Sequence, residues 1–82
     1  LHGAEGDEDG FVFFEKAIEL SRGLDPSPVL EGEVYLEYGR FRQQLGDPAE
    51  ARACFERAQE LFTTAQDAAG KERAAKELAG TV

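Results

Sequence analysis

Methionine is absent from the 82 residues, and cysteine and histidine occur only once each. Cys54 has no second cysteine with which to form an internal disulfide, so we expect a reducing, cytoplasmic setting. His2 alone supplies neither a catalytic triad nor a histidine metal cluster. An intact translation product begins with methionine, whereas this sequence begins with Leu1. We therefore expect it to be a piece excised from a longer chain.

Basic residues and long apolar runs are also scarce. Nine Lys and Arg stand against 17 Asp and Glu, which gives a net charge of −8 at pH 7. This balance disfavours nucleic acids and anionic membranes as partners, because both attract an excess of positive charge. No apolar run approaches the roughly 20 residues that cross a bilayer. The first ten residues lack the basic and apolar start of a secretion signal.

An internal repeat organises what is present. The segment FEKAIEL at residues 14–20 returns as FERAQEL at residues 55–61, with five identical residues and one Lys/Arg exchange at an offset of 41. The same offset relates Gly39 to Gly80, and two such periods fill the 82 residues. With 41% hydrophobic and 32% charged residues, the composition suits a folded domain. The sequence therefore indicates a repeat protein.

Helix start and stop signals divide the chain into an all-α domain, residues 11–82, behind a short leader. Ser27 before Pro28, and Asp47 before Pro48, are typical helix starts, and Gly46 is a typical helix end. Sustained strand-like alternation is lacking. The predicted helices span residues 11–22, 28–45, 48–64 and 68–79. Three glycines and a run of acids predict a flexible acidic lead-in over residues 1–10.

Residues 35–61 carry a recognisable pattern of large and small side chains, which resembles one tetratricopeptide repeat. Its members are Tyr35, Tyr38, Gly39, Gly46, Asp47, Glu50, Ala51, Phe55, Ala58 and Leu61. Small residues such as Gly39 and Ala51 allow two antiparallel helices to approach closely. The resemblance implies an α-solenoid of antiparallel helix hairpins that binds a protein or peptide. A generic two-helix hairpin is the alternative.

The period of 41 residues is longer than the usual 34. This resembles the long-repeat type of kinesin light chains and of the sensor arms of bacterial signalling ATPases and transcription regulators. By the resemblance, residues 11–22 are the second helix of one repeat and residues 68–79 the first helix of another. The first helix would then lack a neighbour, which predicts an exposed self-association or array interface at Phe11, Phe13 and Phe14. Alternatively, the leader folds back over these rings.

The resemblance also places a partner-binding groove on the helix of residues 28–45. Six residues at spacings of three and four are predicted to line it: Glu33, Leu36, Glu37, Arg40, Gln43 and Gln44. Leu36 is the apolar member, and Arg40 is a candidate partner for a ligand carboxylate. The alternative is that these are ordinary solvent-facing residues.

No catalytic or cofactor-binding pattern emerges from the sequence. The acidic leader up to Gly10 resembles a calcium loop, but Lys16 stands where a bidentate glutamate is needed. Cys54 lies beside Phe55, so we expect a small buried hydrophobe. We therefore predict a non-enzymatic protein-interaction module without metal or cofactor. Alternatives are a self-associating spacer segment and, remotely, a fragment of an enzyme whose chemistry lies elsewhere.

Overall fold

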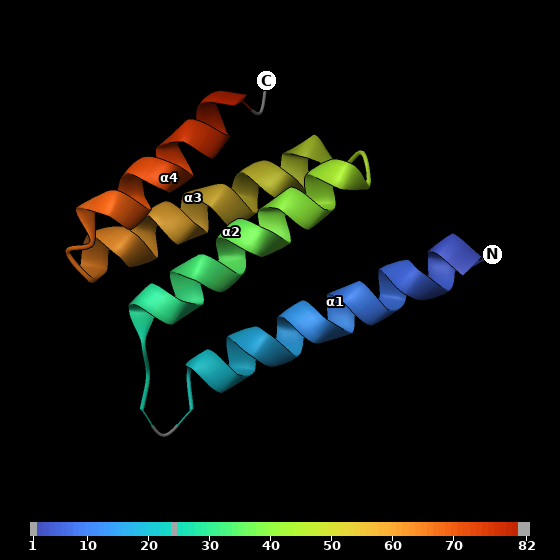
Figure 1. Cartoon of the computed structure of the whole chain (residues 1–82), viewed down its shortest axis with the longest axis horizontal. Helices are drawn as coiled ribbons and strands as arrows, with labels where there is room; N and C mark the ends of the chain where they lie inside the picture. The colour runs from blue at the N-terminus through green and yellow to red at the C-terminus, as the bar shows by residue number, and fades with distance from the viewer. Residues whose placement is uncertain (1, 24, 81–82) are drawn as a thin grey trace.

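A computed structural model describes the backbone of residues 2–23 and 25–80, and the side chains of this part from Gly10 onward. Every regular element in this part is a helix, as the sequence predicts, and successive helices run antiparallel (Figure 1). The four helices are α1 (His2–Ser21), α2 (Pro28–Gln44), α3 (Pro48–Thr64) and α4 (Ala68–Gly80). They form a flat array of 42 × 34 × 14 Å. None of the described helices is both long and apolar enough to cross a membrane.

Side-chain caps fix the starts of the last three helices. The Ser27 hydroxyl accepts a hydrogen bond from the Leu30 amide at 3.2 Å, and the Asp47 carboxylate accepts one from the Glu50 amide at 3.4 Å. Asp67 accepts a bond from the Gly70 amide at 3.1 Å in the same way. These bonds satisfy backbone donors that have no partner within the helix. The local sequence therefore determines where these helices begin.

The first helix differs from its predicted range, because α1 begins at His2 rather than near Phe11. Acidic residues at a helix N-terminus interact favourably with the helix dipole, and a glycine costs only about 1 kcal/mol in a helix. Gly10 also has a packing reason, since an added Cβ would overlap the ring of Phe41 on α2. The flexibility of residues 1–10 stays a prediction, and Leu1 lies outside the described residues.

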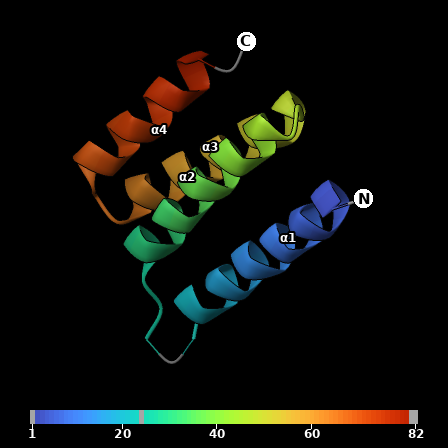
Figure 2. The same cartoon turned by 45° about the vertical axis from the view of Figure 1, so that its right-hand side comes forward.

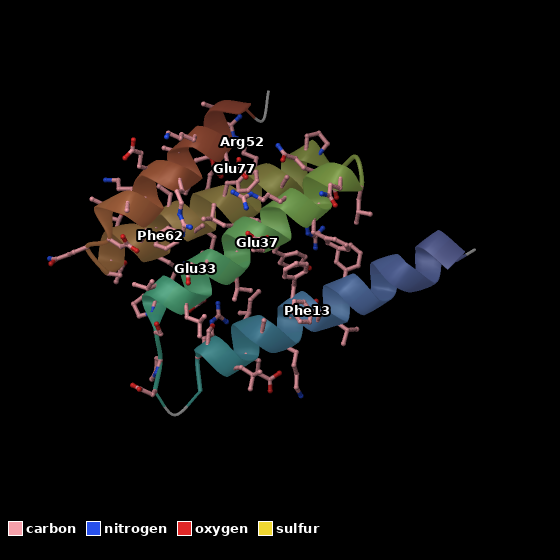
Figure 3. All side chains as sticks on the ribbon, in the orientation of Figure 1. Phe13, Glu33, Glu37, Arg52, Phe62 and Glu77 are labelled. Carbon is pink, nitrogen blue, oxygen red and sulfur yellow. The ribbon has the colours of Figure 1, made fainter. Side chains whose placement is uncertain are left out.

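The main core lies between α2, α3 and α4. Its buried members are Leu36, Ala51, Phe55, Ala58, Phe62 and Ala74. Two rings fill space that glycines leave open: Phe55 packs against Gly39, and Phe62 packs against both Gly32 and Gly70. Figure 3 shows Phe62 near the end of α3, beside the starts of α2 and α4. Aromatic rings set into glycine positions therefore hold the three helices close together.

A second cluster joins α1 to α2. Ile18, Tyr38 and Cys54 form its buried part. Phe14 stacks on Tyr38 with ring centroids 5.0 Å apart, and Phe11 meets Phe41 edge-on at 5.4 Å. These contacts correct the expected exposure of all three N-terminal phenylalanines. Phe11 and Phe14 point toward α2, whereas Phe13 is 65% exposed.

Candidate protein-binding groove

A shallow hollow lies between α2 and α4, on the face where the sequence predicts a groove. Its volume is about 270 Å³, and it is lined by Glu33, Leu36, Glu37, Arg40 and Arg73. Four of the six predicted residues thus lie together, joined by Arg73 of α4. Gln43 and Gln44 occupy the last turn of α2 and are not among the lining residues.

Leu36 forms the floor of this hollow rather than an exposed apolar contact. Its side chain is only 2% exposed because it packs in the core with Phe62 and Ala74. Leu36 thus lines the hollow but lies deeper than the sequence indicates, and its role in partner binding stays a prediction. A ligand in the hollow would therefore meet mainly the charged rim.

The rim is a network of opposite charges that spans two helices. Arg40 donates from Nε to Glu77 on α4 at 2.6 Å and from Nη1 to Glu37 at 2.8 Å. Arg73 lies 3.6 Å from Glu33 across the same gap. Glu33 and Glu37 run along α2 and face the gap to α4, with Glu77 on its far side (Figure 3).

The hydrogen bond to Glu77 raises the pKa of Arg40, whose guanidinium stays charged. Two carboxylates of this chain, those of Glu37 and Glu77, already accept hydrogen bonds from Arg40 and offset part of its charge. That Arg40 binds a ligand carboxylate stays a prediction. The side chains of Glu33 and Glu37 are 50% and 61% exposed, which leaves their carboxylates accessible at the rim.

Sequence reasoning missed the α4 side of the groove, Arg73 and Glu77. A usable signal existed, because Gly80 of α4 repeats Gly39 of α2 at an offset of 41. Two helices in equivalent repeat positions lie side by side in an array, as α2 and α4 do here (Figure 2). Residues of both helices are then expected to line one surface.

Cys54 lies away from this hollow, on α3, in the cluster with Ile18 and Tyr38. Burial raises the pKa of its thiol above the ordinary value, with a smaller opposing effect from Arg42. A raised pKa lowers the fraction of reactive thiolate. Among side chains from Gly10 onward that the structure describes, no group of three or more His, Cys, Asp or Glu is placed to hold a metal ion.

Comparison with known protein families gives one match, to the tetratricopeptide repeat, over residues 32–63. The matched segment covers most of α2, the turn at Gly46 and nearly all of α3. It supports a tetratricopeptide repeat at these residues, while the long-repeat subtype stays a prediction. Searches of curated proteins and of solved structures gave no significant match. Repeats of this family generally mediate protein–protein interactions.

Proposed function

We propose that the chain is a protein-interaction module that binds a segment of another protein in the hollow between α2 and α4. The observation that carries this proposal is the charged rim built jointly by Glu33, Glu37 and Arg40 of α2 and Arg73 of α4. Rims of charged residues around a depression give an interface specificity and orient its partner. The match to a tetratricopeptide repeat supports the same function.

The charges favour a basic partner. Three carboxylates and two guanidiniums meet at the rim, and the whole chain carries a net charge of −8. The rim therefore carries a net charge of −1, and the carboxylates of Glu33 and Glu37 are half-exposed or more. A segment with Lys or Arg side chains would therefore find complementary charge, and long-range attraction would speed its association.

Selection from a displayed peptide library tests this function. We expect the selected peptides to be enriched in Lys and Arg and to lose about tenfold in affinity for the Glu37→Lys variant, equivalent to about 1.4 kcal/mol. Glu56→Lys is the matched control, because Glu56 is similarly exposed and likewise pairs with an arginine of its own helix. Selected peptides that bind both variants equally well would place the binding surface elsewhere.

A second candidate function is self-association through α1. The observation that favours it is the exposure of Phe13, which is 65%, on a helix whose other two N-terminal phenylalanines are used internally. We propose no nucleophilic role for Cys54, because its side chain is buried and burial raises the pKa of its thiol.

A further inference from the structure

An apolar stripe on α1 faces away from the core. Phe13, Ala17 and Leu20 lie on one side of the helix, because they are spaced by four and three residues. Phe13 is 65% and Leu20 is 70% exposed. An adjoining hollow of about 310 Å³ is lined by Phe13, Phe14 and Ala17 of α1 and by Glu33, Val34 and Glu37 of α2, so Glu33 and Glu37 border this hollow as well as the one beside α4. We call Phe13, Ala17 and Leu20 the α1 stripe; Phe13 is labelled in Figure 3.

The internal repeat shows which helix-packing surface of α3 corresponds to the α1 stripe. Adding 41 to its three residue numbers gives the α3 residues Cys54, Ala58 and Leu61. These equivalents are 7%, 0% and 9% exposed. Cys54 clusters with Tyr38, and Ala58 clusters with Leu36, both of α2. The face of α3 that α2 covers is therefore the face that α1 leaves open.

The helix equivalent to α2 in the next period is α4. Gly39 of α2 leaves room for the ring of Phe55 on α3. Gly80 on α4 lies 41 positions after Gly39, and Phe14 on α1 lies 41 positions before Phe55. A Cβ added at Gly80 would meet no described atom within 4 Å. Within one chain α4 lies on the opposite side of α2 from α1 (Figures 1 and 2). Among the described residues of one chain Gly80 therefore has no neighbouring ring, and a second copy of the chain offers Phe14 as the equivalent of Phe55.

Charge also selects α4 rather than α1 as the partner of the stripe. Six acidic residues and one lysine give α1 a charge of −5, whereas three basic and two acidic residues give α4 a charge of +1. Pairing α1 with α1 of another copy would bring like charges together, but pairing α1 with α4 brings opposite charges together.

From these observations we propose that α4 of one copy packs on the α1 stripe of a second copy, as α2 packs on α3 within the chain. The proposal rests on the self-association function and names the two surfaces that meet. Such a contact is head-to-tail. After two copies have paired, one copy still has an uncovered α1 stripe and the other an uncovered α4, so association continues into larger assemblies.

Sedimentation velocity over a wide concentration range tests self-association. The sedimentation coefficient of the chain should rise with concentration, and Leu20→Glu should abolish the rise. Val12→Glu is the matched control, because Val12 is also on α1 and is 63% exposed but lies off the stripe. Circular dichroism should show unchanged helix content in both variants. A wild-type chain that stays monomeric overturns self-association and the proposal together.

Mixing two variants tests the head-to-tail geometry separately. Lys76→Glu changes the charge of α4 from +1 to −1, so this variant should fail to associate alone, as Leu20→Glu does. Their mixture should form a 1:1 heterodimer and nothing larger, because it retains one intact α4 and one intact α1 stripe per pair. A Lys76→Glu homodimer that does not exchange with Leu20→Glu would support self-association but overturn α4 as the occupant.

Discussion

Gly39 and Phe55 meet where α2 lies against α3, and the absence of a side chain at Gly39 makes the contact possible. Phe55 is fully buried and cannot swing away without opening the core. A methyl group at position 39 would overlap its ring. The close approach of the two helices therefore depends on this one glycine, a dependence that the spacing of small residues indicates already in the sequence.

Gly39→Ala should lower the free energy of unfolding by up to about 2 kcal/mol, because overpacking costs about 1–3 kcal/mol and the gain in helix propensity returns only about 1 kcal/mol. Denaturant titration of the monomer measures the effect. Gly80→Ala, at the equivalent position with no described neighbour within 4 Å, should change stability by less than about 1 kcal/mol. Equal losses in the two variants would contradict the packing role of Gly39.

The buried thiol of Cys54 should react with alkylating agents in a pH-dependent way. Because burial raises the pKa of its thiol, less thiolate is present at a given pH than for an exposed cysteine. The rate of alkylation by iodoacetamide in the folded chain should therefore reach its midpoint at a higher pH than in denaturant. A folded-state midpoint at or below the denatured one would show an activated thiol instead.

At the scale of elements, α1 is attached more weakly than the other helices. It contacts α2 mainly through Phe11, Phe14 and Ile18, while α2, α3 and α4 share the larger core. An ion pair between Arg22 and Glu31, 2.7 Å apart, adds a bridge at the end of α1. Arg22 is half-exposed but the Glu31 side chain is only 9% exposed, so loss of Arg22 would leave a buried carboxylate without its partner. Docking of α1 therefore depends on this pair as well as on the aromatic contacts.

Phe14→Ala should lower the free energy of α1 docking by about 2 kcal/mol, because Phe14 is partly buried and loses its stack on Tyr38. Hydrogen exchange should accelerate in α1 and change little in α3. Phe13→Ala, one residue away and mostly exposed, should alter exchange far less. If both variants released α1 equally, the inward orientation of Phe14 would be wrong.

Local sequence signals account for the helical fold class but not for the start of α1. Ser27 and Asp47 cap their helices through residues only three positions away, so short-range patterns reveal them. The extension of α1 to His2 includes Gly10, whose place in the helix is explained by packing against Phe41, 31 residues farther along the chain. A contact that distant leaves no local pattern from which it can be predicted.

At the scale of the whole molecule, the same limit applies to the groove. Spacings of three and four brought Glu33, Glu37 and Arg40 onto one stripe, but they did not reveal that Arg40 hydrogen-bonds to Glu77, 37 residues away. They also did not show that Leu36 lies deep in the core. Helix periodicity predicts which residues share a face, whereas the depth and the ion pairs of that face arise from the packing of α4.

We propose above all that the face shared by α2 and α4 binds a protein segment. Titrating the isotope-labelled chain with a selected basic peptide, and following its amide resonances by NMR, tests this claim most directly. We expect the largest shift changes around Glu33, Glu37 and Arg40 and around Arg73, and we expect added salt to weaken the binding. Shift changes centred on the outer face of α3, with binding indifferent to salt, would contradict it.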